Sequence, residues 1–569
     1  MIILSAEPTF AELFTPKLVT ILREHYGARD LKADVVAGLT VAIVALPLSM
    51  AIAIASGVTP DRGLYTAIVG GFCVSALGGS RFQIGGPAGA FIVLVAATVQ
   101  QHGLDGLLLA TFVSGLIMLA IGLLRLGTFI KYIPYPVTVG FTAGIAIIIF
   151  ASQIKDLLGL TLPGPEPGPI ISQLATLAQA LPTLNVAALC LAVASIAIIL
   201  VLRRFRPHWP GLLFAVAFAS LAGWIFGLPV ETIGTRFGGI PHSLPVPELP
   251  VFSIEKVREV LPSALSFALL GGIESLLSAV VADSMSGRRH RSNCELAAQG
   301  VANMASSLFG GICVTGTIAR TATNVRAGAR GPIAGMLHSL FLLLFMLVAA
   351  PLASFIPLAA LAGVLAVVAW NMVEKHAFAT LIRASRGDAV VLLATFLLVV
   401  FRDLTEGILV GFGIGALLFL HRMAQAVDVE TGRPLVEEDR ADSETGRTAY
   451  DSALATDRDV IILRISGAFF FGAAASVGAA LDRLAEHPKV YILDFAAVPM
   501  LDSTAATTIA AFADKAHRGG TRVLVCGASA PVRHALLQHG VRRPLARFMP
   551  SVQDAVAAAH EETHQRAAE

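Results

Sequence analysis

Long apolar runs, each separated from the next by a short polar or glycine-rich stretch, fill the chain from residue 34 to residue 426. A first set of runs long enough to cross a bilayer covers residues 34–56, 63–79, 86–101, 104–125, 134–154, 184–202 and 210–227. A second set covers 260–285, 293–311, 317–329, 332–355, 357–373, 387–401 and 403–422. The pattern predicts an α-helical polytopic membrane protein with 14 transmembrane spans.

Each set holds an odd number of spans, so the second seven-span repeat (about 260–422) must be inverted relative to the first (about 34–227). Lysine and arginine give the orientation, because cytoplasmic loops retain them. A cytoplasmic N-terminus places on that side Arg81, Arg125, Lys131, Arg203, Arg204, Arg206, Arg288, Arg289, Arg291, Arg326, Arg330, Lys375, Arg383, Arg386 and Arg422. We therefore expect both termini in the cytoplasm, with residues 1–33 as a cytoplasmic N-terminal segment and 34–426 as the transport domain.

The pattern changes after the last span. A charged linker, 427–458, precedes a region, 459–569, in which short apolar runs alternate with amphipathic stretches. Strands are expected at 460–465, 490–495 and 523–526, with helices near 474–486, 503–518, 530–539 and 551–562. This alternation predicts a small cytoplasmic α/β domain. It has no phosphate-binding glycine loop and no nucleophile elbow, so a regulatory role is expected rather than a catalytic one.

Composition supports a membrane protein, since 55% of the 569 residues are hydrophobic, 14% are charged and the mean hydropathy is +0.75. The net charge of +2 excludes nothing. Residues 1–33 carry charges and no apolar core, so no cleavable signal peptide is expected. The five Cys and 14 His show no ligand or disulfide spacing, so no metal, cofactor, catalytic residue or nucleic-acid partner is predicted.

Two glycine-broken segments occupy matching places in the two repeats, Gly85-Gly86-Pro87-Ala88-Gly89-Ala90 and Thr315-Gly316-Thr317-Ile318-Ala319-Arg320-Thr321. Broken helices at membrane depth are tolerated where they line a cavity, and their free N–H groups attract an anion. A small anionic substrate is therefore expected to contact Ser49, Gly86, Pro87, Ala88, Gly89, Ala90, Phe91, Ala319, Arg320 and Thr321. For any one small residue, tight helix packing is the alternative interpretation, and for Phe91 it is lipid or core packing.

Arg320 is the strongest single candidate, because a guanidinium stays protonated and is costly near the middle of a membrane. A start of the half-helix near Gly316 would put it close to the positive end of the helix dipole. The alternative is a structural arginine bonded to backbone carbonyls or to an acid such as Glu274.

Glu274 in the eighth span is a candidate proton carrier, because a buried carboxylate at membrane depth can take up and release a proton. The alternative is a static partner for Arg320. Asp283 lies nearer the cytoplasmic end of the same span, where we expect a salt bridge with Arg288 or Arg289.

Several motifs, in order along nearly the whole chain, resemble those of the SulP (sulfate permease, solute carrier 26-like) family. They are Asp34-Val35-Val36-Ala37-Gly38-Leu39-Thr40, Ala45-Leu46-Pro47-Leu48-Ser49-Met50-Ala51, Gly78-Gly79-Ser80-Arg81-Phe82 before Gly86-Pro87, and a STAS-type Leu501-Asp502-Ser503-Thr504-Ala505. The family commonly has Gln where this chain has Leu48. Ile273-Glu274-Ser275-Leu276-Leu277 and Ala369-Trp370-Asn371-Met372 are most similar to the bacterial DauA-type branch of C4-dicarboxylate transporters.

The resemblance implies fourteen spans divided into core and gate domains, elevator-like motion, a homodimer and a bacterial inner membrane. It also implies an ion-coupling site at Glu274, Ser278, Gly316 and Thr317. In the STAS domain it implies a phosphorylatable Ser503 and a cytoplasmic regulator, although Asp502 can instead simply cap the following helix.

The predicted function is proton-coupled symport of C4-dicarboxylates such as succinate, fumarate or aspartate. Sulfate or bicarbonate transport, with sodium as the alternative coupling ion, comes next. A nucleobase carrier of the same fold, a passive anion channel and a membrane-anchored signalling protein are the competing hypotheses.

Overall fold

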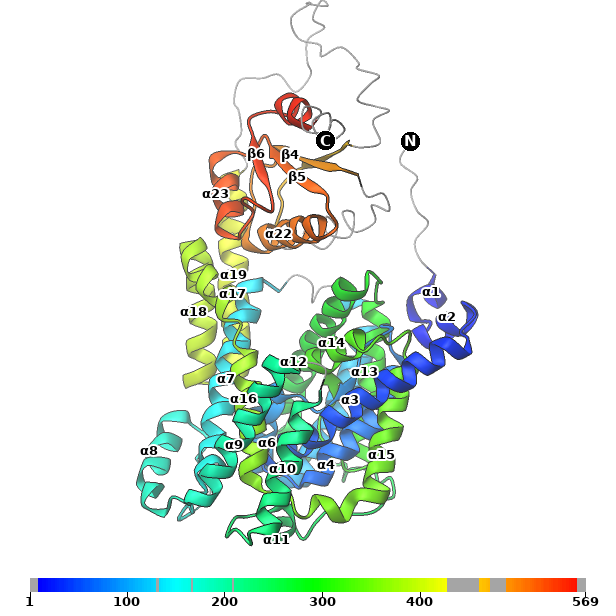
Figure 1. Cartoon of the computed structure of the whole chain (residues 1–569), viewed down its shortest axis with the longest axis vertical. Coiled ribbons are helices and arrows are strands. Elements are labelled where there is room, and N and C mark those ends of the chain that lie inside the picture. The colour runs from blue at the N-terminus through cyan, green and yellow to red at the C-terminus, as the bar shows by residue number, and fades with distance from the viewer. Residues whose placement is uncertain are drawn as a thin grey trace, which may run out of the picture. The chain divides into compact units, whose positions relative to one another are not determined.

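The computed structural model describes residues 9–128, 133–164, 167–206, 209–426, 460–470 and 488–559. It divides into two compact units (Figure 1). The first comprises Met1–Ile130, Phe141–Glu374 and Phe396–Gly407, and the second comprises Lys131–Gly140, Lys375–Thr395 and Ile408–Glu569. The expected linker 427–458 and the expected helix near 474–486 lie outside the described residues.

Helices cover every run of the first predicted set. Their bounds are α3 (Ala28–Ala55), α4 (Pro60–Tyr65) continued by η1 (Thr66–Gly70) and α5 (Gly71–Leu77), η2 (Gly89–Phe91) continued by α6 (Ile92–Leu123), α7 (Tyr135–Leu158), α9 (Val186–Phe205) and α10 (Gly211–Ile225). The third and fourth runs share α6, which is kinked at Gly103.

The second set is also reproduced. It corresponds to α12 (Ile254–Ser286), α13 (Ser292–Leu308), α14 (Ile318–Arg326), α15 (Ile333–Ala353), α16 (Leu358–Met372), α18 (Arg386–Phe401) and α19 (Leu404–Ala426). Among the described residues, seven helices are individually long and apolar enough to cross a membrane. The other predicted spans are covered by shorter or broken helices, among them α14 in the third run of the second set.

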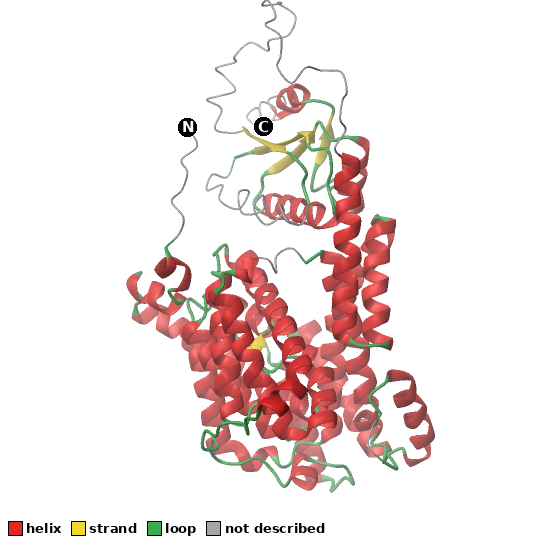
Figure 2. Ribbon diagram, turned by 180° about the vertical axis from the view of Figure 1, so that it is seen from behind, coloured by secondary structure: helices red, strands yellow, loops and turns green. Residues whose placement is uncertain are grey.

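The two repeats interleave instead of forming separate halves. Helix α6 of the first repeat packs against α12 and α13 of the second, α15 packs against α3 and α5, and α16 packs against α9. Contacts between the repeats therefore build the interior of the first unit. Two very short strands, β1 (Gly85–Gly86) and β2 (Thr315–Gly316), lie among these helices, as Figure 2 shows.

Several short elements were not predicted. They are α1 (Phe10–Phe14), α2 (Lys17–Arg23), α8 (Ile170–Ala180), η4 (Leu181–Thr183), α11 (Ile233–Phe237), α17 (Lys375–Ala384) and β6 (Arg547–Met549). The helices among them are short and mostly amphipathic, so they contain no apolar run of bilayer length. Strand β6 is too short to stand out in the pattern.

The C-terminal region of the second unit contains the predicted α/β domain. Strands β3 (Val460–Ser466), β4 (Val490–Ala497), β5 (Arg522–Cys526) and β6 form one parallel sheet in the order β3-β4-β5-β6. Tyr491, Leu493 and Phe495 pack on one face with residues of α22 (Ser503–Arg518) and α23 (Ala530–Gln538). Val490 and Ile492 pack on the other face with residues of the helix at 552–559. Burial on both faces explains why the strands read as continuous apolar runs.

A glycine substitution tests the kink between the third and fourth spans. Gly103 has φ 68° and ψ −171°, a conformation open essentially to glycine alone. We expect Gly103→Ala to lower the free energy of unfolding by about 1–3 kcal/mol. Thermal unfolding in detergent micelles measures this change.

Gly413→Ala is the matched control, because an added Cβ there meets no atom within 4 Å and the residue is helical. It should leave stability unchanged or raise it by about 0.5–1 kcal/mol. Equal unfolding temperatures for the two variants would contradict the strained kink.

Candidate functional site

The two broken segments cross one another inside the first unit. Strands β1 and β2 pair antiparallel, with Gly85 opposite Gly316 and Gly86 opposite Thr315. The Thr317 N–H extends the pairing by donating to the Ile84 carbonyl at 3.0 Å. Just beyond the crossing, each segment enters a helix, at η2 and α6 in the first repeat and at α14 in the second. The unpaired N–H groups of two helix starts thus lie beside one short sheet, as expected for an anion site.

Glycine is required at this crossing by close approach. A Cβ on Gly86 would lie 2.0 Å from Nη1 of Arg320, and a Cβ on Gly316 would lie 1.6 Å from Nε2 of Gln83. Both distances are far below van der Waals contact. The two glycines therefore make room for polar side chains at the crossing.

Arg320 lies in the first turn of α14 and is 1% exposed. Its Nη2 donates to Oγ of Ser49 at 3.1 Å and to the Pro87 carbonyl at 3.3 Å. Its Nε and Nη1 have no hydrogen-bond partner among the described residues. The guanidinium thus joins α3 to the first broken segment and keeps two donors without a partner.

Arg320 and Glu274 form no ion pair in the part of the chain that the structure describes, since Arg320 Nη1, Arg320 Nε and Glu274 Oε2 are all buried without a partner. The static pairing considered from the sequence is therefore not observed. The other structural alternative, bonding to backbone carbonyls, accounts for a single contact, to Pro87.

The remaining predicted anion ligands divide into two groups. Ala88, Ala90 and Phe91 are 3%, 4% and 1% exposed, and the Phe91 ring lies 6.0 Å from that of Phe267 on α12. Phe91 therefore packs in the protein core, as its alternative interpretation proposed. Ala319, by contrast, is exposed, so the start of α14 reaches the surface of the first unit next to the buried Arg320.

Thr321 ties the crossing together. Its Oγ1 accepts from the Ile84 N–H at 3.1 Å and from the Ser278 hydroxyl at 3.0 Å. Thr317 Oγ1 donates to the Ile84 carbonyl at 3.3 Å. These hydroxyls replace backbone hydrogen bonds that the broken helices lack.

Glu274 lies on α12 one helical turn before Ser278, and α12 meets β2 and α14 along a seam of hydroxyl contacts. Ser275, its neighbour, accepts from the Gly316 N–H at 3.1 Å, and Ser278 reaches Thr321. Glu274 Oε2 is buried without a partner among the described residues. Burying an unpaired charge is costly, so the position suits a group that exchanges a proton. The predicted coupling residues Ser278, Gly316 and Thr317 all belong to the same seam between α12 and α14.

Four further buried polar residues, which the apolar runs and glycine breaks did not single out, shape the crossing. Asn303 on α13 clamps Val314, accepting from its N–H at 3.0 Å and donating to its carbonyl at 2.9 Å. Asn324 donates to the Phe82 carbonyl at 2.9 Å, and Ser275 shares a 2.7 Å hydrogen bond with the Thr315 hydroxyl. Gln83 is 3% exposed, and neither amide atom has a partner among the described residues. The sequence does contain a signal for these four residues. Each is a polar residue within or beside an apolar run that meets a broken segment.

One predicted ion pair is wrong. Asp283 accepts from His290, at 2.7 Å from Nδ1 and 3.0 Å from the backbone N–H. The salt bridge expected with Arg288 or Arg289 is not found there, because the turn after α12 folds His290 back onto the carboxylate instead.

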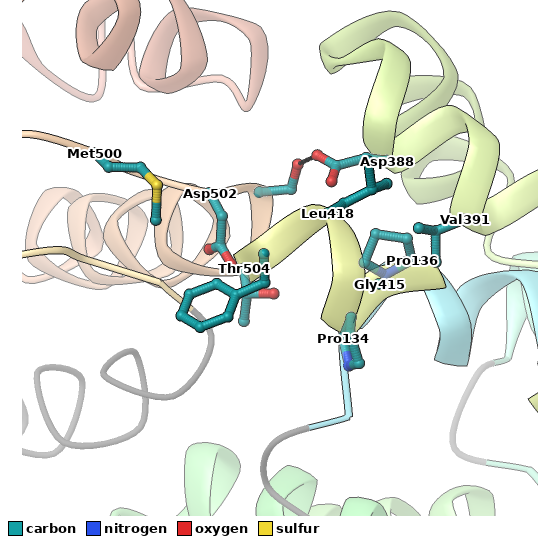
Figure 3. A pocket seen from close by; sticks show the side chains of 11 residues that line it. Pro134, Pro136, Asp388, Val391, Gly415, Leu418, Met500, Asp502 and Thr504 are labelled. Atoms are coloured by element: carbon teal, nitrogen blue, oxygen red, sulfur yellow. Dashed lines mark hydrogen bonds between the residues drawn. The ribbon is translucent and has the colours of Figure 1, made fainter. Parts of the chain in front are cut away.

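Ser503 belongs to a different place, in the second unit. It begins α22 and is 5% exposed, and its hydroxyl donates to the Asp388 carboxylate. Asp388, Asp502 and Thr504 line a small pocket together with residues of α7, α18 and α19 (Figure 3). Asp502 caps α22 by accepting from the Ala505 N–H at 2.8 Å, which confirms the capping interpretation. A phosphate on Ser503 would meet the Asp388 carboxylate, so phosphorylation stays a prediction that requires this contact to open.

Comparisons with known proteins agree with this architecture. The sequence profile of the sulfate permease family matches residues 31–395, and that of the STAS domain matches residues 452–555. The chain is 39% identical to YvdB of Bacillus subtilis over 519 residues, which cover 91% of this chain and 95% of that protein. It is 30% identical to the bicarbonate transporter BicA of Synechocystis sp., with 89% and 90% covered. It is 29% identical to the sodium-independent sulfate anion transporter of Bos taurus, with 89% and 85% covered.

Solved structures show the same fold. The transmembrane domain of a cyanobacterial bicarbonate transporter, BicA, matches with a TM-score of 0.61 at 32% identity, over 67% of this chain and 98% of that chain. SLC26A9 matches with a TM-score of 0.66 at 19% identity, over 97% and 93%. The predicted helical membrane fold with a C-terminal STAS domain is thereby confirmed.

Proposed function

Because the chain belongs to the sulfate permease family, we propose that it is a secondary transporter that carries a small anion across the membrane together with a proton. Family and relatives make it an anion transporter and not an enzyme. The coupling ion, the substrate and the motion are our proposals.

One observation carries this proposal. Arg320 is the one Lys or Arg side chain in the described residues that is buried, and it lies against the two helix starts with Nε and Nη1 unpartnered. A permanent charge in an apolar interior is costly unless an opposite charge arrives. A small anion can supply that charge while accepting from the guanidinium and from N–H groups of the helix starts.

Proton coupling rests on Glu274. A carboxylate on a helix that contacts the anion site can load a proton while the site loads an anion, so that the loaded carrier moves with less uncompensated charge. Sodium is the alternative, which would need several oxygen ligands around Glu274. The bovine relative is named sodium-independent, which favours a proton here.

Sulfate or bicarbonate is the first substrate that we propose. Relatives along most of the chain are named for these anions. A single buried cation also suits a compact oxyanion better than a C4-dicarboxylate, whose second carboxylate needs donors several ångströms away. The sequence-based choice of succinate, fumarate or aspartate stays a prediction that a substrate panel decides.

Reconstituted liposomes test the proposal. We expect uphill uptake of labelled sulfate or bicarbonate when an inward proton gradient is imposed, with unlabelled anions competing in order of affinity. Gradient-independent current would indicate a channel. Accumulation of uracil but of no anion would contradict the charge complementarity at Arg320, and so would a carrier that takes up only neutral solutes.

Glu274→Gln tests the coupling, because it removes the titratable group and keeps the shape. The steady-state accumulation ratio under a proton gradient should fall at least about tenfold, which corresponds to about 1.4 kcal/mol, while anion exchange without a gradient persists. Glu255→Gln, an exposed change in the first turn of α12, is the control. Full proton-driven uptake by Glu274→Gln would exclude this residue as the proton carrier.

Gly86→Ala tests the anion site, because its Cβ would lie 2.0 Å from Arg320 Nη1 and must displace the guanidinium. The half-saturation concentration for the anion should rise at least about tenfold. Gly223→Ala in α10 is the control, since the nearest atom to an added Cβ there is the Pro357 Cγ at 3.8 Å. Equal half-saturation concentrations for the two variants would mean that the guanidinium does not bind the anion.

We further propose an elevator-like motion, a homodimer in a bacterial inner membrane with cytoplasmic termini, and a regulator that binds the STAS domain. Each rests on the family resemblance. Crosslinking in native membranes tests the dimer and the topology.

A further inference from the structure

The N-terminal segment, residues 9–34, reaches the loop that enters the first broken segment. The Lys17 N–H donates to the Gly78 carbonyl at 2.9 Å, and Glu24 forms a 2.6 Å ion pair with Arg81. Arg291, which donates through its own N–H to the Gly79 carbonyl, also donates through Nη1 to the Thr15 carbonyl at 2.6 Å. The segment is thus bonded to the loop both directly and through Arg291.

The same segment reaches the loop that leaves the second half-helix. Asp34 accepts from the N–H groups of Arg330 and Gly331 at 2.6 and 3.2 Å, and its other oxygen accepts from the Tyr26 hydroxyl at 2.6 Å. Ile21, the buried residue of α2, packs against Gly331. A Cβ added to Gly331 would lie 2.6 Å from the Cδ1 methyl of Ile21. One short stretch of chain therefore holds both loops.

The two loops are also joined through the site itself. The Phe82 carbonyl accepts from Asn324 on α14, and the Ile84 N–H donates to Thr321. These hydrogen bonds and packing contacts form a continuous ring. It runs from the N-terminal segment to the first loop, across the strand crossing to α14, and back to Asp34.

We propose that residues 9–34 act as a strap that positions the two broken segments relative to each other, with Glu24, Tyr26 and Asp34 as its positioning residues. None of them touches the crossing. Their effect passes through the two loops, so the helix starts that flank Arg320 stay in one geometry while the protein moves. The inference goes beyond the proposed transport, which it uses for one of its readouts.

Hydrogen exchange of the full-length protein in lipid nanodiscs tests the strap without any substrate. In the double variant Glu24→Ala/Tyr26→Phe, which removes the acceptor of Arg81 and the donor to Asp34, amides in peptides covering residues 78–84 and 328–333 should exchange about fivefold faster, as for one lost hydrogen bond behind each loop. Glu12→Gln, a change within the exposed capping box of α1, should leave both peptides unchanged. Unchanged exchange in the double variant, or equal effects in the control, would overturn the strap.

Transport separates positioning from general stability. The double variant should raise the half-saturation concentration for the transported anion at least about threefold at unchanged maximal rate per folded protein, because the ligand groups are less well aligned. A lower maximal rate with an unchanged half-saturation concentration would assign these residues a merely structural role and overturn the proposal. If wild-type protein transports nothing, the proposed function fails, and the exchange experiment still decides the strap.

Lys17 gives the strap a pH dependence, because it is half-buried at the point where the strap bonds to the first loop through the Gly78 carbonyl. Burial, together with the charges of Arg291 and Arg81, lowers the pKa of Lys17 to about 8, against the opposing effect of Asp283 and Glu24. A detached strap would carry a lysine of ordinary pKa, 10.5, and so would bind more protons between these values. Docking is therefore weakest below pH 8 and strengthens as the pH rises towards 10.5.

After correction for intrinsic exchange, protection of the amides in residues 17–24 should rise at least about fivefold between roughly pH 7.5 and 9.5. Lys17→Arg keeps its charge over this range and should show no such rise. A flat wild-type profile, or the same slope in Lys17→Arg, would exclude Lys17 as the titrating group.

Discussion

A permanently charged guanidinium buried in an apolar helical assembly is the constraint around which the first unit is organised. Arg320 is 1% exposed, and its partners are one hydroxyl, Ser49, and one backbone carbonyl, Pro87. Such an arrangement is unfavourable unless the surroundings bring further negative charge or dipoles to it. The helix starts do not neutralise it, since their N–H groups are also positive. The site is therefore short of negative charge, which is what an anion binder requires.

Breaking two helices in this interior creates a second demand, because backbone groups that leave a helix need new partners. The two strands satisfy part of it by pairing with each other. Side chains from neighbouring helices satisfy more, as when Asn303 clamps Val314 and Ser275 accepts from Gly316. Most polar residues around the crossing thus bond to the backbone, while Arg320, Glu274 and Gln83 each keep buried polar atoms without a partner among the described residues.

The interleaving of the repeats explains why these partners come from distant parts of the chain. Helix α12 supplies Ser275 and Ser278 to α14, while α3 supplies Ser49 to Arg320. The N-terminal segment adds contacts at both outer loops, which links a region outside the membrane spans to the geometry of the site. Relatives named for sulfate and for bicarbonate align along most of this chain, and the BicA transmembrane domain shares its fold, so the fold alone does not specify the anion.

The sequence by itself determined the placement of the apolar runs, the position of the two broken segments and the strands of the STAS domain up to β5. These features follow from local periodicity and from glycine and proline, whose effects act within a few residues. Only the tertiary structure decided that Thr321 holds Ile84, that Phe91 belongs to the core and that Asp283 binds His290 instead of an arginine. Those outcomes depend on which side chains from remote helices arrive at one point. The hydrophobic pattern determines how deep a residue lies in the membrane and which face of its helix it occupies. It does not specify which remote side chain becomes its partner.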